Sequence, residues 1–306
     1  MERFDIHILG CGSASPTSRH FPSSQVINHN DRLFMFDCGE GSQMQFRNMK
    51  LKFSRLNHIF ISHLHGDHCF GLIGLISTLG LLGRSADLFV YAHPDAETLF
   101  APLLQYFCKD LPFKVKFVGF SPQRSDLLYE DKRITVRSIP LKHRVPTAGF
   151  LLEEKPRLRH IIKEMADYYQ VPLSSYLSIK EGCDYTHPES GEVIPNGILT
   201  TPSGTSLKYA YCSDTAYTEK IIPYIEGVDL LYHEATFAAD NLSRAKETFH
   251  STAAQAAQMA IKANVKQLLI GHFSARYNDE RVLLEEAKKL FPNTVLANDG
   301  MTLSLR

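Results

Sequence analysis

Residues 59–68, with the sequence IFISHLHGDH, constrain the fold of this 306-residue chain more than any other segment. They place His63, His65, Asp67 and His68 directly after an apolar run that is typical of a strand. Imidazole and carboxylate are ligands that Zn²⁺ or Mn²⁺ accepts. On a helix His63 and His65 would diverge by about 200°. In a turn that leaves a strand they can converge on one ion, while Asp67 and His68 face a second.

Three more side chains of these types stand just beyond predicted strands: His143, Asp214 and His272. Loops at strand ends place functional residues on a rigid scaffold. With the first cluster they supply five histidines and two aspartates, about the number that a two-metal site with an open edge for water needs. The other histidines have no ligand-type neighbours in spacing, and we expect surface or core roles for them: positions 7, 20, 29, 58, 93, 160, 187 and 233.

Two residues are of catalytic rather than ligating type. Glu234 closes one predicted strand, and His250 precedes a predicted helix over 252–263. A carboxylate that orients an imidazole is a common acid/base arrangement. Alternatively His250 is only the neighbour of a helix cap, because Ser251 or Thr252 could cap that helix. The spacing alone does not decide between these two interpretations.

Short apolar runs alternate with helical patterns along the chain. Runs rich in Val, Ile, Phe and Tyr predict strands over residues 4–9, 32–36, 58–61, 88–91, 115–118, 134–139, 148–152, 209–211, 228–232, 267–270 and 294–296. Helical periodicity predicts helices over residues 72–82, 96–107, 157–169, 252–263 and 280–290. This mixture indicates an α/β or α+β fold in which helices cover sheets.

Residues from about 153 to 206 differ in composition from the rest of the chain, because they contain five prolines and four glycines and few runs typical of strands. We interpret this segment as an arm inserted into a single domain that spans residues 1–306; the alternative is a long surface connection without a role of its own. Four basic residues fall within nine positions of it: Lys155, Arg157, Arg159 and Lys163. Such a run is usually a solvated helix face, but here it is the best candidate for contacting phosphates.

The composition excludes several classes of protein. With 44% hydrophobic and 22% charged residues the chain is globular rather than disordered or fibrous. Lys+Arg and Asp+Glu both number 33, so a nucleic-acid partner would be held by a local patch. Six cysteines without a CxxC pair fit a reducing cytosol. The longest uncharged stretch has 15 residues, fewer than the roughly 20 of a membrane span, and we expect a soluble cytoplasmic protein.

The motif HLHGDH at 63–68 matches the metallo-β-lactamase superfamily, and further segments narrow the match: LGCGSA at 9–14, FDCGEG at 36–41, SDT at 213–215, HEATF at 233–237 and GHFSARY at 271–277. Over essentially the whole chain these resemble the ribonuclease Z family in its short form. The resemblance implies a four-layer αβ/βα sandwich with two Zn²⁺ ions per chain, or Mn²⁺ or another divalent ion in their place. It implies one ion held by His63, His65 and His143, and another held by Asp67, His68 and His272, with Asp214 bridging.

The implied activity is that of an endoribonuclease that removes the 3′ trailer from tRNA precursors. The products are a tRNA with a 3′-hydroxyl and a trailer with a 5′-phosphate. Asp67 is similar to the family's proton acceptor. His250, supported by Glu234, is similar to the histidine that assists the leaving oxygen. The resemblance also implies a homodimer, in which the arm of one subunit grips precursor tRNA that the other subunit cuts.

The chain departs from the family pattern in two places. Many bacterial members carry Pro-x-Lys-x-Arg-Asn near the first strand, a loop linked to rejection of tRNAs that already end in CCA. Here the corresponding residues 16–21 read PTSRHF. The arm shows Val171-Pro172 where its relatives have a Gly-Pro pair.

Two other functions compete with RNA processing. One is a phosphodiesterase or other hydrolase of small molecules on the same fold, because many chemistries share the histidine motif. A basic projecting arm has no evident use in such an enzyme. The other is a non-catalytic RNA-binding protein with a vestigial metal site. The presence of all seven ligand-type residues together with His250 argues against it.

Overall fold

The computed structural model describes residues 2–306, and the chain divides into two compact units. The first unit contains residues up to Glu130 together with Thr135–Leu152 and Lys208–Arg306. The second unit contains Asp131–Ile134 and Glu153–Leu207, and the insertion expected over about 153–206 falls within it. None of the helices among residues 2–306 is long and apolar enough to cross a membrane.

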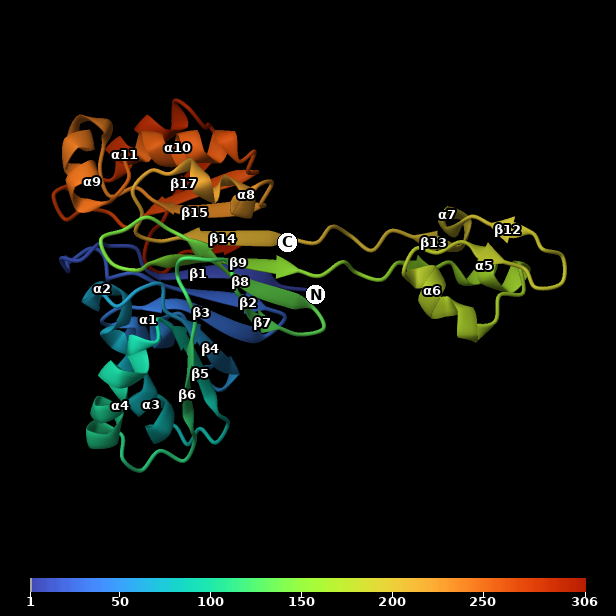
Figure 1. Ribbon diagram of the computed structural model, residues 1–306, viewed down its shortest axis with the longest axis horizontal. Coiled ribbons are helices and arrows are strands. Elements are labelled where there is room, and N and C mark those ends of the chain that lie inside the picture. The colour runs from blue at the N-terminus through green and yellow to red at the C-terminus, as the bar shows by residue number, and fades with distance from the viewer. Residues whose placement is uncertain (1) are drawn as a thin grey trace. The chain divides into compact units, whose positions relative to one another are not determined.

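Two seven-stranded sheets form the centre of the first unit (Figure 1). One sheet has the order β18-β1-β2-β3-β4-β5-β6, with β18 (Thr302–Ser304), β1 (Phe4–Gly10), β2 (Ser24–His29), β3 (Arg32–Cys38), β4 (Leu56–Phe60), β5 (Leu88–Ala92) and β6 (Val115–Gly119). The other has the order β17-β16-β15-β14-β9-β8-β7, with β17 (Thr294–Leu296), β16 (Gln267–Gly271), β15 (Leu230–Glu234), β14 (Lys208–Cys212), β9 (Ala148–Glu154), β8 (Ile134–Pro140) and β7 (Leu127–Glu130).

Helices cover the outer faces of the two sheets (Figure 1). On the first sheet lie α1 (Ser42–Asn48), α3 (Gly71–Leu81) and α4 (Asp95–Phe107), with the short α2 (Gly66–Cys69) leading into α3. On the second lie α8 (Ile222–Ile225), α9 (Leu242–Thr248), α10 (Ala253–Lys262) and α11 (Arg281–Lys288). This arrangement confirms the predicted four-layer αβ/βα sandwich.

Strand direction brings the ends of several strands to one edge. Neighbours along β3-β4-β5-β6 are parallel, as are neighbours along β14-β15-β16-β17. Parallel strands buried on both faces need continuous apolar runs, and β14, β15 and β16 supply them with almost every side chain buried. Their carboxyl ends therefore open at the same edge of the second sheet.

Aromatic side chains fill the space between the two sheets. The Phe36 ring centroid lies 5.5 Å from that of Phe60, 5.1 Å from that of Phe150 and 5.8 Å from that of Tyr211. All four rings are buried. Because Phe36 and Phe60 come from the first sheet and the other two from the second, this contact joins the sheets that carry the site.

The second unit has its own small core of Ala166, Val171, Ile179, Tyr185, Ile194 and Leu199. Its elements are short: β10 (His160–Ile161), α5 (Lys163–Tyr168), α6 (Tyr176–Lys180), β11 (Tyr185–Thr186), β12 (Val193–Ile194), α7 (Asn196–Leu199) and β13 (Thr200–Thr201). The predicted helix over 157–169 is wrong in its first half. There β10 pairs with β13 and the Arg159 amide donates to the Lys180 carbonyl, so contacts distant in sequence override the helical pattern.

We predict that Phe36→Ala lowers the free energy of unfolding by about 3–5 kcal/mol, because it leaves a cavity between the two sheets. Urea unfolding followed by circular dichroism measures this loss. The control is Leu81→Ala, at a side chain that is 87% exposed and should change stability by less than about 0.5 kcal/mol. Equal effects of the two substitutions would show that the aromatic layer does not hold the sheets together.

Candidate metal centre

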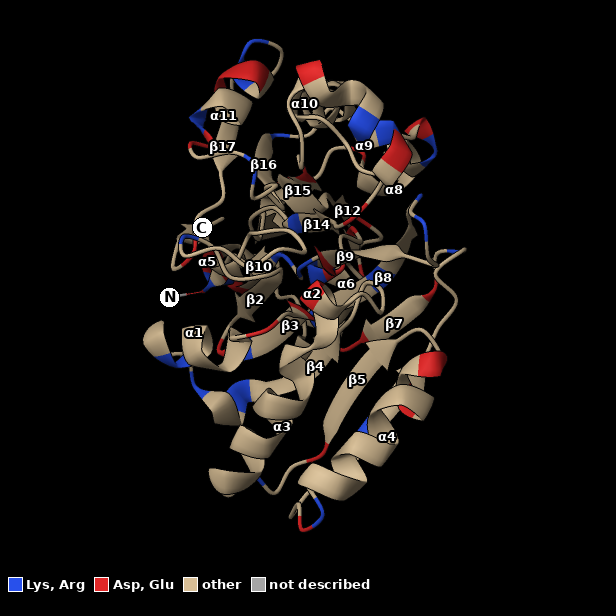
Figure 2. Ribbon diagram, turned by 90° about the vertical axis from the view of Figure 1, so that its left-hand side faces the viewer, with Lys and Arg blue, Asp and Glu red and all other residues tan. Residues whose placement is uncertain are grey.

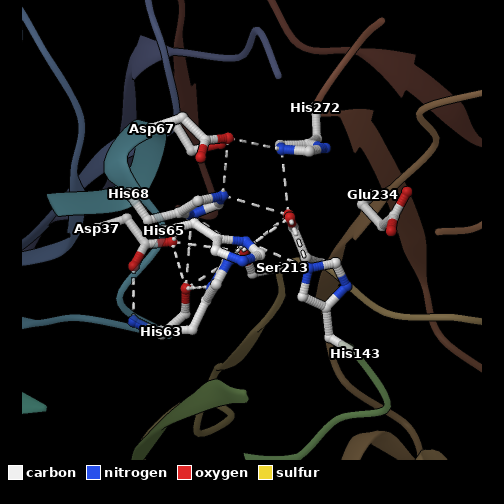
Figure 3. Close-up of polar contacts among 12 residues, drawn as sticks. Asp37, His63, His65, Asp67, His68, His143, Ser213, Glu234 and His272 are labelled. Carbon is white, nitrogen blue, oxygen red and sulfur yellow. Dashed lines mark hydrogen bonds and ion pairs between the residues drawn. The ribbon is translucent and has the colours of Figure 1, made fainter. Parts of the chain in front are cut away.

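The seven ligand-type residues predicted from the sequence lie together at one edge of the first unit (Figure 3). His63 follows β4, His143 follows β8, Asp214 follows β14 and His272 follows β16. His65, Asp67 and His68 lie in the turn after β4 and in α2. Each side chain is thus placed by the end of a strand or by the turn that leaves it.

The first group of donor atoms comes from His63, His65, His143 and Asp214. His65 Nδ1 lies 3.0 Å from His63 Nε2 and 3.4 Å from His143 Nε2. Asp214 Oδ2 lies 3.6 Å from His63 Nε2 and 3.7 Å from His143 Nε2. Three imidazoles and one carboxylate oxygen therefore surround a single point.

The second group comes from Asp67, His68, Asp214 and His272. His68 Nε2 lies 3.3 Å from Asp67 Oδ2 and 3.3 Å from Asp214 Oδ1. His272 Nε2 lies 3.5 Å from Asp67 Oδ2 and 3.1 Å from Asp214 Oδ1. The two oxygens of Asp214 thus face different groups, which is the geometry of a bridging carboxylate.

Both groups fit divalent metal ions. Tetrahedral Zn²⁺ with ligands at about 2.0–2.1 Å has ligand atoms about 3.3 Å apart, close to the separations in both groups. The buried His68 Nε2 forms no hydrogen bond within residues 2–306, although two carboxylate oxygens lie 3.3 Å away. A cation between these atoms would satisfy all three at once.

The protonation of the imidazoles differs between the two groups. Burial lowers the pKa of His63 well below its usual value and lowers those of His65 and His143. These rings are therefore neutral, which is the form that binds a metal ion. Burial alone would lower the pKa of His68, but the negative charges of Asp67 and Asp214 outweigh burial and raise that pKa well above its usual value. At His68 a metal ion must therefore displace a proton.

The outward nitrogens of the candidate ligands contact fixed acceptors, an arrangement that sets ring orientation in metal sites. His143 Nδ1 lies 2.9 Å from the Phe249 carbonyl. His272 Nδ1 lies 2.9 Å from Thr236 Oγ1, and His68 Nδ1 lies 2.7 Å from Asp37 Oδ2.

Asp37 is a residue whose role was not predicted from the sequence, although it lies in the motif FDCGEG. Its buried carboxylate accepts hydrogen bonds from the Ser62 amide (2.7 Å), Ser62 Oγ (2.8 Å) and the Tyr211 hydroxyl (2.7 Å). Figure 3 shows it on the side of His68 away from the second donor group. Gly71 allows this packing, because a Cβ there would lie 2.0 Å from the Gly39 carbonyl oxygen. Asp37 therefore ties the first sheet to the turn that carries His63 and His68.

Glu234 and His250 form the pair that the sequence suggested. His250 Nδ1 lies 2.8 Å from Glu234 Oε1, and the buried carboxylate also accepts from the Thr215 amide and the Thr236 hydroxyl. Burial lowers the pKa of His250, but the charge and hydrogen bond of Glu234 outweigh it and raise the pKa to about 9. Thr252 caps α10 together with Gln255, so the cap of that helix does not depend on the His250 ring.

A cavity of about 360 Å³ joins these groups. His65, Asp67, His143, Asp214, His250 and His272 line it. Its wall also includes Arg144, Arg244 and Arg276, and the Arg276 guanidinium lies 4.8 Å from the centre of the Phe237 ring. Figure 2 shows Lys and Arg on α9, the helix that contributes Arg244. Arg144 and Arg244 were not singled out from the sequence, because nothing local distinguishes them from surface cations, and Arg276 was noted only as part of the motif GHFSARY.

The four basic residues proposed for RNA binding lie in the second unit. Lys163 begins α5 and is exposed, whereas the other three side chains are half-buried. Arg157 Nη2 lies 3.2 Å from Glu154 Oε1, and Arg159 Nε donates to Thr200 Oγ1 over 2.6 Å. Arg157 and Arg159 are thus partly engaged inside their own unit.

Comparisons with known proteins agree with the fold. A sequence model of the family described as Anti-Pycsar protein Apyc1 matches residues 4–103. Proteins named Ribonuclease Z from Bacteroides thetaiotaomicron and Parabacteroides distasonis are 61% and 58% identical to the chain over 305 residues. The alignments cover all of this chain and 96% and 100% of those proteins.

Solved structures give the same picture. Human tRNase Z, short form, superposes with a TM-score of 0.71 at 25% identity, and the match covers 99% of both chains. YhfI from Bacillus subtilis, a metallo-β-lactamase fold protein, superposes with a TM-score of 0.68 at 20% identity over 99% of both chains. The layered sheets and the histidine-rich edge define a protein of the metallo-β-lactamase fold. Within that class, the chain belongs to the ribonuclease Z family.

We predict that Asp37→Asn weakens divalent metal binding by about 10–100-fold, because His68 loses the carboxylate that orients its ring. Competition with a chelator of known affinity measures the change. The matched control is Asp87→Asn, at a carboxylate that pairs with Lys116 and accepts from the Lys114 amide, and it should leave metal affinity unchanged. Unaltered affinity in the Asp37 variant would contradict the positioning role.

Proposed function

We propose that this protein is a tRNA 3′-processing endonuclease that cuts off the 3′ trailer of precursor tRNA. The observation that carries the proposal is that two metal-type donor groups and the Glu234–His250 pair share one cavity in a member of the ribonuclease Z family. Three arginines in the same wall provide positive charge for a phosphodiester backbone.

The two donor groups would hold two divalent ions. We propose Zn²⁺ for both, with Mn²⁺ as the alternative, because five of the seven ligands are imidazoles. One ion would be held by His63, His65 and His143, and the other by Asp67, His68 and His272. Asp214 would contact both ions. Bound there, the ions would polarise the phosphoryl group and lower the pKa of water to about 7.

The protein's own side chains would move the two protons of the reaction. As water attacks phosphorus, the Asp67 carboxylate at the cavity wall accepts the water proton. The bond between phosphorus and O3′ of the discriminator nucleotide then breaks. His250, held protonated by Glu234, donates a proton to that oxygen. The products are a tRNA with a 3′-hydroxyl and a trailer with a 5′-phosphate.

Cleavage of a precursor tRNA tests this function directly. Wild-type protein loaded with Zn²⁺ should cut after the discriminator nucleotide, and the Asp214→Ala variant should not, because both donor groups lose their shared ligand. Sequencing of the product ends measures the cut position. Hydrolysis of a small chromogenic phosphodiester without any cut in precursor tRNA would indicate a small-molecule phosphodiesterase instead.

We predict that His250→Ala keeps its metal content and lowers kcat on precursor tRNA by about 10²–10⁴-fold, the usual value of proton transfer by a positioned acid. An aryl phosphodiester should be much less affected, because its leaving group needs no proton. Metal analysis and kcat on both substrates are measured together.

The matched control is His93→Ala, at a histidine that faces the exposed Asp95, and it should retain wild-type kcat. Loss of metal from the His250 variant would make His250 a ligand or the support of one. A wild-type rate of the His250 variant on precursor tRNA would show that His250 does not take part in the reaction.

We also propose that the basic run of the second unit contacts RNA phosphates. Residues 153–207 contain five Lys or Arg and eight Asp or Glu, so the segment is net acidic. Such contact would therefore depend on the local run and not on the charge of the whole segment. Lys163 is its natural probe because it is exposed, and Lys155 is replaced with it so that two charges of the run are removed together.

We predict that Lys155→Gln with Lys163→Gln raises KM for precursor tRNA. The slope of the logarithm of the binding constant against the logarithm of salt concentration should become shallower by roughly one for each phosphate that is no longer neutralised. Turnover of a small phosphodiester should not change. Rates measured over a range of salt concentrations check both points. The control pair is Lys50→Gln with Lys288→Gln, two exposed lysines of the first unit. Equal loss on both substrates would assign the run a structural role.

We propose a homodimer as the working state. Supporting it, α4 exposes Leu99, Leu103 and Tyr106, which fall on one face at helical spacing. Exposed apolar surfaces of this kind commonly mark contacts between proteins. We further propose the cytoplasm as the place of action, because precursor tRNA is found there.

A further inference from the structure

A second cluster of ligand-type side chains lies in the first unit, outside the candidate metal centre. It consists of Cys11, His20 and Asp299. Cys11 directly follows β1, His20 lies in the loop before β2, and Asp299 lies between β17 and β18. Because 279 positions separate His20 from Asp299, no spacing in the sequence could suggest that they meet. The prediction that His20 has only a surface or core role rested on spacing alone.

The three donor atoms lie close to one another. Cys11 Sγ lies 3.3 Å from His20 Nδ1 and 3.2 Å from Asp299 Oδ1, and His20 Nδ1 lies 3.4 Å from Asp299 Oδ1. Around a tetrahedral zinc ion, sulfur lies about 3.5 Å from a nitrogen or oxygen ligand, and nitrogen lies about 3.3 Å from oxygen. Each separation here is within about 0.3 Å of those values.

The surroundings of the cluster also suit a metal ion. Cys11 is fully buried, and the side chains of His20 and Asp299 are 9% and 10% exposed. His20 Nε2 lies 3.4 Å from Glu280 Oε1, and a carboxylate on the far nitrogen is the usual partner of a metal-bound histidine. The Ala297 carbonyl oxygen, 3.6 Å from Cys11 Sγ, offers a fourth donor.

We propose that Cys11, His20 and Asp299 form a further metal site, a structural zinc site. Thiolate, imidazole and carboxylate together favour Zn²⁺ over Mg²⁺ or Ca²⁺. Cys11 Sγ–H donates to Asp299 in the metal-free protein, so binding releases that proton and leaves a thiolate on the ion.

The position of the cluster indicates what the ion would do. It would join the end of β1, the loop that carries His20 and the segment between β17 and β18. Pro16 and Pro22 of that loop line a cavity of about 500 Å³, whose wall also includes His65 and Asp67. A zinc ion at Cys11 would therefore fix one wall beside the candidate metal centre.

A hydrogen-bonded clamp without metal is the competing account. In it, a protonated His20 lies between Asp299 and Glu280, whose charges and hydrogen bonds raise its pKa despite partial burial. Only the metal site, however, places a thiolate on a metal ion. This difference can be measured by spectroscopy.

Cobalt substitution tests the proposal, because neither donor group of the candidate centre contains a cysteine among the described residues. Protein loaded with Co²⁺ should show a near-ultraviolet sulfur-to-cobalt charge-transfer band. Cys11→Ser should abolish the band, and its zinc content should fall by one equivalent relative to wild type. Asp299→Asn should weaken the band. Cys108→Ser, at a half-buried thiol on the end of α4, should leave the band and the zinc content unchanged.

Absence of the band from wild-type protein would overturn the proposal and leave the hydrogen-bonded clamp. So would a band that survives in Cys11→Ser. If that variant fails to fold, the wild-type spectrum decides, together with a cobalt titration of Cys108→Ser. The result does not depend on the proposed RNA-processing activity, because the experiment measures only thiolate ligation and the difference in zinc content between two proteins.

Discussion

The carboxylate of Asp214 is the group on which the rest of the site depends. One of its oxygens faces His63 and His143, and the other faces His68 and His272. Burial opposes its ionisation, but His272 and His68 outweigh that effect and hold its pKa well below the usual range. A buried charge without partners is strongly destabilising. Positive charge beside Asp214 therefore stabilises it, and metal ions in the two donor groups would supply that charge on both sides without protonating the ligands.

The fold supplies the rigidity that such a site needs. Asp37 and His272 have φ values of +57° and +62°, in the left-handed region that costs a residue other than glycine about 1–3 kcal/mol. Such conformations persist only where the surroundings over-determine them. Here Asp37 lies near the end of β3, and His272 directly follows β16. These two buried strands belong to the sheets on either side of the aromatic layer around Phe36. That layer keeps the two sheets together, so it also keeps the donor atoms from the two sheets within a few ångströms of one another.

The sequence predicted those parts of the site that are local. His63, His65, Asp67 and His68 follow one strand within six residues, so their chemistry and spacing are visible together. His143, Asp214 and His272 could be assigned because each follows an apolar run. The sequence left two interpretations of His250 open. In the structure its Nδ1 lies 2.8 Å from Glu234 Oε1, which supports the pairing, while Thr252 caps the helix as the other interpretation assumed.

What the sequence could not show depends on contacts between distant segments. In the sequence, Asp37 looks like the end of an ordinary strand. Its role in orienting His68 arises only where β3 meets the turn before α2. Cys11 and Asp299 meet where β18 pairs with β1, and the loop between β1 and β2 brings His20 to them. β2 was not predicted, because Ser24, Gln25 and Asn28 interrupt its apolar pattern, although pairing with β1 and β3 buries them. In the second unit, pairing between β10 and β13 replaced half of a predicted helix.

Anomalous X-ray diffraction from crystals of the zinc-loaded protein, recorded on both sides of the zinc absorption edge, tests the central claim most directly. The account predicts two peaks at the edge of the sheets. One should lie among His63, His65 and His143, the other among Asp67, His68 and His272, with Asp214 between them. A single peak, or peaks that do not contact Asp214, would contradict the bridged two-metal site.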